Sequence, residues 1–345
     1  MSKNNIIMDI ALRKSNQRKN TEKLIINIPN SIAEQRFIKI GGINQWITIR
    51  GENLNNPILL FIHGGPASPY SIFCPLLRSW EKHFTIVQWD QRGAGKTFRK
   101  NIKGSHGTIT FDRLTQDGVE VAEYLLNYIG QEKLILIGSS VGSIIGTRMV
   151  KSRPELFHAY VGTDQNVSSD TQILSYQMTL EALHAAGHIK GVQTLKKIGP
   201  DPSRWSRQDF DQKNQWAVKA NTTVPNMIMD IILPSMLSSP NHSIRDIIDI
   251  FKGMNFSLDL LFDELLTSDL HKLGLQFELP VFIFQGDNDL VTPPKIAKEF
   301  FDEIDAPHKE FVLIKNAGHL AAFARPDQFL SELNMRVCPA IWPSS

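Results

Sequence analysis

One short segment carries a serine in a setting suited to nucleophilic chemistry. Residues 138–142 follow the pattern Gly-x-Ser-x-Gly and lie between an apolar run and a stretch with helical periodicity. A serine held in a tight turn from strand into helix needs small residues two positions away on each side, because its backbone must bend and its oxygen must project. This spacing selects Ser140, rather than Ser139 or Ser143, as the candidate nucleophile. Such a serine requires an oxyanion-binding loop, an acid and a base elsewhere in the chain.

Phosphate binding is the alternative for the glycine-rich segments, and it fails on spacing. Gly138, Gly142 and Gly146 recur every four residues, whereas a dinucleotide-binding turn needs G-x-G-x-x-G at the first strand of its unit. The segment 92–97 ends in Gly-Lys-Thr like a phosphate loop, but Asp90 occupies the position of the required earlier glycine. A tight turn after a strand explains its glycines better.

An oxyanion-binding loop is predicted at His-Gly-Gly-Pro, residues 63–66, directly after an apolar run. Glycines at the carboxyl end of a strand let a backbone N–H face a developing oxyanion. We expect the oxyanion hole to consist of Gly65, with Gly64 beside it, and of Val141, the residue after the nucleophile. His63 is expected to shape this loop, because the base should follow the acid in chain order.

The acid is predicted in the segment Gln-Gly-Asp-Asn-Asp, residues 285–289, which leaves a strand and turns at a glycine. Asp289 stands three residues past that glycine, far enough to point back over the carboxyl edge of the sheet. Asp287 is better placed to stabilise the turn. A helix is expected to begin directly afterwards, with Thr292 as its N-cap.

The base is predicted at His319. It follows the apolar run 311–314 through a short loop, so it should reach the same sheet edge as Ser140 and Asp289. His308 precedes that run and therefore belongs to the opposite edge. Three further histidines fall in a part of the chain with helical patterns: His184, His188 and His242.

These residues together predict covalent catalysis. Ser140 would attack a carbonyl carbon, and His319 would take its proton and deliver it to the leaving group. Asp289 would orient the imidazole and stabilise its charged form, and water would release the acyl-enzyme. The scheme requires neither a metal nor an organic cofactor.

The elements that position these residues follow from apolar runs separated by helical patterns, which predict an α/β fold with a mainly parallel sheet covered on both faces. The expected strands are 58–62, 84–89, 134–137, 159–161, 281–284 and 311–314, preceded by a hairpin of 36–40 and 46–50. From about 164 to 271 no strand pattern appears and amphipathic stretches recur.

Three parts of the chain are therefore expected. Residues 166–271 should form a helical cap, or lid, inserted between two halves of one core, because insertions are tolerated at strand-end loops. The core comprises 36–165 and 272–345. Residues 1–35 should form an N-terminal extension.

Composition argues against several classes of protein. The 345 residues include 37 basic and 35 acidic side chains, a formal net charge of +2 that provides no electrostatic reason to bind nucleic acid. The basic cluster at 13–23 is expected to be a solvated arm.

Cys74 and Cys338 are too few for a disulfide framework and lack the spacing of a metal site. No apolar run approaches the ~18 residues of a membrane span, and no signal-peptide core is present, so a cytoplasmic protein without membrane partners is expected.

The segments HGGP, WDQRGAGKT, GSSVGS, GDNDLVTPP and NAGH together resemble the α/β-hydrolase fold. Within that fold they are similar to the proline iminopeptidases, serine aminopeptidases that release N-terminal proline. The run Asp-Gln-Arg-Gly, 90–93, is more typical of that branch than Gly-x-Ser-x-Gly is. The resemblance covers 36–165 and 272–345 and implies an eight-stranded sheet with a cap after the sixth strand. Ser140, Asp289 and His319 match the triad positions of the family.

The chain departs from that family in two respects. Proline iminopeptidases usually carry a tryptophan directly after the nucleophile, where this chain has Val141. Their caps also supply acidic residues that hold the free amine of the substrate, in motifs rich in Trp and Glu. The corresponding residues here do not align with that pattern and are interpreted as core aromatics and solvated charges: Trp205, Trp216, Glu181 and Asp209 to Asp211.

The sequence therefore predicts a serine hydrolase similar to proline iminopeptidases that acts on a small amide, ester or short peptide. A carboxylesterase or lactonase of a small metabolite is an alternative from the same chemistry. A protein that binds a small molecule on this fold without turnover is an alternative from another class. Neither the natural substrate nor the oligomeric state follows from the sequence.

Overall fold

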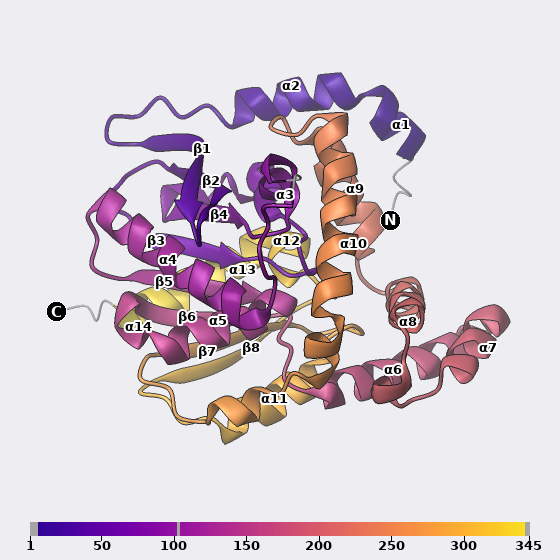
Figure 1. Ribbon diagram of the computed structural model, residues 1–345. Coiled ribbons are helices and arrows are strands. Elements are labelled where there is room, and N and C mark those ends of the chain that lie inside the picture. Colours follow the sequence, from indigo (N-terminus) through magenta and orange to yellow (C-terminus); the bar gives the residue numbers. More distant parts are fainter. Residues whose placement is uncertain (1–5, 102–103, 342–345) are drawn as a thin grey trace.

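The computed structural model describes residues 6–101 and 104–341, and one eight-stranded sheet forms its centre (Figure 1). The spatial order is β1-β2-β4-β3-β5-β6-β7-β8. β1, β2 and β4 pair antiparallel, and all other neighbours pair parallel. The predicted mainly parallel eight-stranded sheet is therefore confirmed. The strands are β1 (Ile32–Ile40), β2 (Ile43–Gly51), β3 (Ile58–Ile62), β4 (Thr85–Asp90), β5 (Leu134–Ser139), β6 (Phe157–Thr163), β7 (Val281–Gly286) and β8 (Lys309–Ile314).

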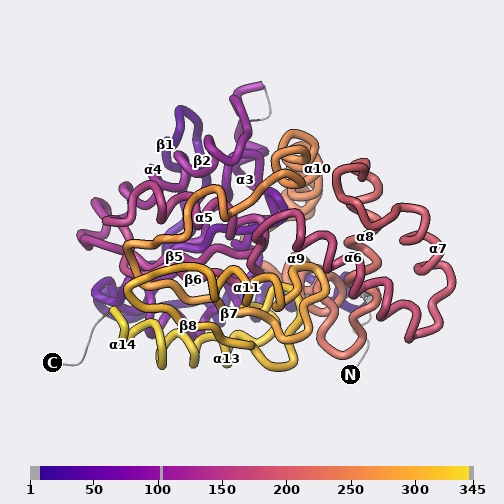
Figure 2. The backbone as a smooth tube through the Cα atoms, turned by 90° about the horizontal axis from the view of Figure 1, so that it is seen from below, coloured from indigo at the N-terminus to yellow at the C-terminus, as the bar shows by residue number. Residues whose placement is uncertain are grey.

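The central strands are apolar on both faces because helices cover both. Along β3, Leu60 and Ile62 enter one hydrophobic cluster, and Leu59 and Phe61 enter the other. The helices that contribute to the first cluster include α4 (Phe111–Ile129), α5 (Val141–Ser152) and α11 (Pro294–Glu303). The second cluster includes residues of α12 (Ala321–Ala324) and α13 (Pro326–Glu332), and Figure 2 shows α5 and α13 on opposite sides of the sheet. The sheet is thus rigidly held between two layers, with its strand ends free to carry a site.

The chain between β6 and β7 is helical. Its α-helices are α6 (Ser169–Ala185), α7 (Ile189–Ile198), α8 (Arg207–Ala220), α9 (Leu233–Ser238) and α10 (Ile244–Thr267), and together with their connections they are called the helical insertion below. Ser206 and Ser243 each form a capping box with the aspartate three residues later, which defines where α8 and α10 begin. The two helical stretches that the sequence suggests at 244–251 and 258–266 form one helix of 24 residues.

The N-terminal segment lies against the helical insertion. Helices α1 (Ile6–Ala11) and α2 (Arg13–Lys23) run beside α9 (Figure 1). Gln17 Nε2 donates to the carbonyl of Ser239 at 2.7 Å. β1 begins at Ile32, so residues 32–35 belong to the sheet and not to the predicted extension. Within the described residues, no helix combines the length and apolar character needed to cross a bilayer.

Candidate active site

Ser140 occupies a strained turn between β5 and α5. Its φ of 55° and ψ of −126° lie in a region that non-glycine residues avoid, at a cost of ~1–3 kcal/mol. The flanking glycines make the turn possible. A Cβ at Gly142 would lie 2.1 Å from the carbonyl oxygen of Ile62, and a Cβ at Gly138 would lie 2.9 Å from the carbonyl oxygen of Gly142. The structure thus gives Ser140 the backbone geometry that the Gly-x-Ser-x-Gly spacing predicts.

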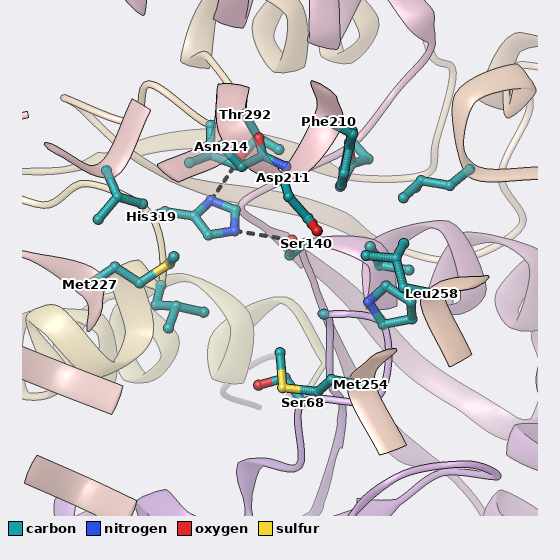
Figure 3. A pocket seen from close by; sticks show the side chains of 18 of the residues that line it. Ser68, Ser140, Phe210, Asp211, Asn214, Met227, Met254, Leu258, Thr292 and His319 are labelled. Atoms are coloured by element: carbon teal, nitrogen blue, oxygen red, sulfur yellow. Dashed lines mark hydrogen bonds between the residues drawn. The ribbon is translucent and has the colours of Figure 1, made fainter. Parts of the chain in front are cut away.

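The three predicted catalytic side chains lie in one hydrogen-bonded chain. Ser140 Oγ is 3.0 Å from His319 Nε2, and His319 Nδ1 is 2.8 Å from Asp289 Oδ2. Asp289 follows β7 and His319 follows β8, so the parallel sheet brings both to the edge where β5 delivers Ser140. Figure 3 shows His319 between Ser140 and Thr292. Asp289 is fully buried and His319 nearly so, which limits competition from solvent.

Asp289 is held by donors that its own turn supplies. Its Oδ1 accepts the N–H groups of Val291 at 2.7 Å and Thr292 at 3.0 Å, and its Oδ2 accepts the Thr292 hydroxyl at 2.7 Å. These three donors hold the carboxyl group in one orientation. The prediction that Thr292 caps the next helix is wrong, because α11 begins at Pro294 with Pro293 as its N-cap. Thr292 instead fixes the orientation of the acid.

Two opposing effects set the proton affinity of His319. Burial alone would lower its pKa, but the Asp289 carboxylate, through its charge and its hydrogen bond, raises the pKa above the usual value for histidine. The charge of Asp164 acts in the same direction, and Lys213 acts against it. His319 is therefore suited to receive a proton from Ser140 and to hold it as an imidazolium.

The residues predicted for the oxyanion hole surround Ser140. A Cβ on Gly64 would lie 2.7 Å from Ser140 Cβ, so only glycine lets this backbone pass the nucleophile so closely. Gly65 has a φ of 115°, which also favours glycine. Val141 is the first residue of α5, and its N–H therefore has no acceptor inside the helix. Gly65, Ser140 and Val141 line one cavity, as two oxyanion donors beside a nucleophile would require.

His63 holds the loop and does not reach the nucleophile chain. Its Nε2 accepts the N–H of Gln91 at 3.2 Å, and Gln91 Nε2 donates back to the His63 carbonyl at 2.9 Å. Burial lowers the pKa of His63 to about 4, so the ring is neutral. Next to Gln91, Arg92 donates to Asp117 at 2.8 Å in a buried ion pair. The Asp-Gln-Arg-Gly run thus braces the loop at 63–66.

A family model described as the alpha/beta hydrolase fold matches residues 57–326. The chain belongs to the α/β-hydrolase fold family. Curated relatives of this hydrolase carry peptidase names. A "Probable aminopeptidase YbaC" of Bacillus subtilis is 29% identical over 88% of this chain and 96% of its own length. A "Proline iminopeptidase" of Lactobacillus delbrueckii subsp. bulgaricus is 23% identical over 83% of this chain and 91% of its own length.

Solved structures show the same fold. A proline iminopeptidase-related protein from Thermus thermophilus superposes with a TM-score of 0.58 at 17% identity, covering 90% of this chain and 98% of its own. Together the comparisons confirm the predicted fold, the similarity to proline iminopeptidases and the assignment to the hydrolases.

The cavity of the hydrolase above Ser140 has a volume of about 250 Å³ and is mainly apolar. The segments that follow the strands contribute Pro66, Tyr70, Val141 and Leu320. The helical insertion contributes Phe210, Val218, Met227, Ile228, Ile232, Met254, Leu258 and Leu265. Val141, where proline iminopeptidases usually have tryptophan, thus presents a smaller side chain to this space. Such a cavity suits a small substrate with an apolar group beside its reacting carbonyl.

The helical insertion places one carboxylate in this cavity. Asp211 lines the cavity, and Figure 3 shows its side chain directed toward the side on which Ser140 lies. Arg207 pairs with Asp211 and lies 3.5 Å from Asp259, so two carboxylates share one guanidinium and the group keeps a formal charge of −1. The Asp211 side chain is 44% exposed, so it is a solvated charge, as interpreted from the sequence, that also lines the cavity.

Other residues of the insertion agree with the sequence interpretation. Trp205 and Trp216 are buried, Glu181 is exposed, and Asp209 caps α8. Helical periodicity alone could not separate Asp211 from Asp209, because both lie on the same short amphipathic helix.

A buried lysine, which sequence reasoning missed, connects the insertion to the loop of the acid. Lys213 is fully buried on α8, and its Nζ donates to Ser175 Oγ and Asn214 Oδ1, each at 2.9 Å. Ser175 donates in turn to the carbonyl of Leu290, next to Asp289. Burial lowers the pKa of Lys213 to about 7.

This lysine should make stability depend on pH. The folded protein releases the Lys213 proton near pH 7, whereas a lysine in an unfolded chain releases it near pH ~10.4, so the unfolded state binds more protons between these values. The free energy of unfolding of the wild type relative to Lys213→Met should therefore rise with pH above 7, by up to about 1.4 kcal/mol per pH unit. Urea unfolding at pH 7, 8 and 9 measures this difference.

The matched control is Lys219→Met, an exposed lysine on the same helix. The difference in free energy of unfolding between this variant and the wild type should stay constant from pH 7 to pH 9. If the free energies of unfolding of the wild type and of Lys213→Met changed with pH in the same way, Lys213 would keep its proton in the folded state.

Proposed function

We propose that this chain is a serine hydrolase that uses Ser140, His319 and Asp289 as a catalytic triad. The observation that carries the proposal is the chain of hydrogen bonds of 3.0 and 2.8 Å beneath a cavity at the carboxyl ends of the strands. This is the arrangement in which a base within hydrogen-bonding reach activates a hydroxyl and is oriented by a third group.

In the first half of the reaction, Ser140 Oγ bonds to the substrate carbonyl carbon while its proton passes to His319 Nε2. The carbonyl oxygen becomes an oxyanion that accepts hydrogen bonds from the N–H groups of Gly65 and Val141. The tetrahedral species collapses, the bond to the leaving amine or alcohol breaks, and His319 returns the proton to that group. Ser140 is left as an acyl ester, and Asp289 stabilises the transient imidazolium.

In the second half, a water molecule gives its proton to His319 and bonds to the acyl carbon. The ester bond to Ser140 then breaks, the serine oxygen regains a proton from His319, and the carboxylic acid leaves. No cofactor takes part in this scheme. Residues 166–271 are proposed to act as the cap, because their helices supply most of the apolar wall that would exclude bulk water.

For the substrate class we propose a small peptide or amide with a free N-terminal amine. Two observations support it: relatives of the chain are named proline iminopeptidase and probable aminopeptidase, and the cavity holds a carboxylate. Asp211 would pair with the protonated amine, while apolar side chains such as Phe210 and Leu258 would contact a proline ring. The net negative charge around Arg207 favours a cationic ligand over an anionic one.

Asp211→Asn should therefore weaken binding of cationic substrates selectively. Loss of a charge-assisted hydrogen bond costs about 1.5–3 kcal/mol, so KM for a proline arylamide should rise about 10- to 100-fold. Turnover of an uncharged ester such as p-nitrophenyl butyrate should change little. Steady-state kinetics of both substrates on the purified variant measure the effect.

Asp259→Asn is the matched control, because Asp259 shares Arg207 but is not among the residues that line the cavity. It should leave both KM values near those of the wild type. Equal losses on the amide and the ester in Asp211→Asn would contradict the amine-binding role.

The esterase and lactonase alternative rests on the apolar wall of the cavity, which would equally suit a neutral acyl group. A substrate panel of arylamides, short acyl esters and lactones decides between the two. Turnover limited to esters or lactones would refute the aminopeptidase proposal and leave the serine hydrolase standing. Reaction with a phosphonylating probe, but no product from any substrate that binds, would favour the ligand-binding alternative.

A further inference from the structure

A second buried carboxylate lies beside the proposed triad. Asp164 directly follows β6, is fully buried and has a φ of 50°. A side-chain atom of Asp164 lies within 4.8 Å of such atoms of both Asp289 and His319. Positive φ in a non-glycine residue and burial of a carboxylate both cost free energy, and such costs concentrate at functional sites. The triad scheme above gives Asp164 no part.

Asp164 accepts hydrogen bonds from two groups of the protein. Its Oδ2 accepts the hydroxyl of Ser139 at 2.8 Å, and its Oδ1 accepts the N–H of Ala321 at 3.2 Å. Both carboxylate oxygens of Asp164 thus accept hydrogen bonds from the protein itself, which makes the carboxylate part of an internal network. Burial raises the pKa of Asp164, while the charge of His319 opposes this shift.

The network extends to the wall of the cavity. Tyr70 Oη lies 2.7 Å from Ser139 Oγ. Because the Ser139 proton points to Asp164, the Tyr70 hydroxyl must be the donor to Ser139. Tyr70 is buried, lines the cavity and has a pKa raised by that burial, so its phenol keeps the proton it donates. The resulting order is Tyr70, Ser139, Asp164 and the Ala321 amide, called the Asp164 network below.

The Asp164 network joins the segments that must stay in register during the reaction. Ser139 is bonded covalently to Ser140, and Ala321 is two residues after His319. Between His319 and Ala321, Leu320 has a left-handed φ of 66°, so the base sits on a turn that the Ala321 contact anchors. One carboxylate thus ties the turn of the nucleophile to the turn of the base.

We propose that Asp164 is a positioning residue for the hydrolytic reaction, holding His319 in register with Ser140 and adding negative charge beside the imidazolium. The inference rests on the proposed serine hydrolase mechanism. Asp164 touches neither substrate nor the attacking oxygen. It acts through Ala321 and Ser139 and through its field at His319.

The test is Asp164→Asn, assayed for kcat, KM and the pH dependence of kcat/KM. Loss of charge and of one acceptor beside the base should lower kcat about 10- to 100-fold, with KM changed less than about threefold. The acid limb of the pH profile should move to lower pH by about half a unit or more, because Asp164 raises the pKa of His319. The other groups that act on His319 are unchanged in this variant: Asp289, which raises its pKa, and Lys213, which lowers it.

A second variant keeps the test valid if the asparagine impairs folding. Glycine adopts a φ of 50° without strain, so Asp164→Gly removes the carboxylate from a backbone that glycine tolerates. It should show the same direction of change in kcat and in the acid limb. The control is Asp287→Asn. Asp287 accepts the N–H of Ala317 in the loop before His319 but lies outside the Asp164 network. Its acid limb should match the wild type.

The outcomes separate this inference from the mechanism on which it rests. Wild-type kcat and an unmoved acid limb in both Asp164 variants, with Ser140→Ala inactive, would overturn the role of Asp164 alone. A lower kcat with an unmoved acid limb would also overturn it, since general disturbance of the fold would account for that loss. Wild-type activity in Ser140→Ala would instead overturn the proposed function.

Discussion

Ser140→Ala should lower kcat about a million-fold on every substrate that the wild type hydrolyses, because it removes the atom that forms the acyl ester. Residual turnover of about 10³- to 10⁴-fold over water would come from the oxyanion-binding groups and substrate binding. The fold should be retained, because alanine deletes one oxygen from a half-buried side chain. The measurement is kcat on a proline arylamide and on a short acyl ester, with thermal unfolding as a check of integrity.

Ser143→Ala is the matched control for this prediction. Ser143 is the third residue of α5, and its hydroxyl donates to the carbonyl of Ser140, so it shares the surroundings of the nucleophile but is bonded away from the base. Its loss of kcat should be no more than about tenfold. Strong loss in Ser143→Ala with activity kept in Ser140→Ala would reassign the nucleophile.

His319→Ala should produce a loss comparable to that of Ser140→Ala, because a serine hydroxyl without its base is a poor nucleophile at neutral pH. The double variant Ser140→Ala with His319→Ala should be no slower than either single variant, since the two residues act as one unit. Single-turnover and steady-state rates of the three variants measure this non-additivity.

The control is His308→Ala, a histidine before β8 at the far edge of the sheet, paired with Glu310 at 3.0 Å. It should retain activity within about twofold of the wild type, as expected for an exposed surface residue. Losses that multiply in the Ser140 and His319 double variant would mean that the two residues act independently, which contradicts the hydrogen-bonded chain between them.

The sequence predicts the sheet well because its central strands are short runs that are apolar on both faces, a pattern that few other structures produce. Once those strands are parallel, every residue just past a strand end reaches the same edge. For that reason Ser140, Asp289 and His319 could be selected from the glycine spacing, the chain order and the position after a strand, without any information on distance.

The contributions of the helical insertion could not be predicted in the same way. An amphipathic pattern shows that a helix has a buried face. That Asp211 lines the cavity and Lys213 lies in the interior depends on how α8 packs against α6 and α7. Asp164 was missed for another reason. The strand predicted at 159–161 continues to Thr163, so Asp164 lies at the active edge, and its positive φ has no signature in a non-glycine residue.

The most direct test of the account is covalent labelling with a fluorophosphonate, followed by intact-mass analysis and peptide mapping. The nucleophile attacks phosphorus and displaces fluoride, so one phosphonyl group per chain should appear. We expect that group on Ser140, with no labelling of Ser140→Ala and greatly slowed labelling of His319→Ala. Equal labelling of wild type and Ser140→Ala, or a phosphonyl group mapped to another serine, would contradict the assignment of Ser140 as the nucleophile.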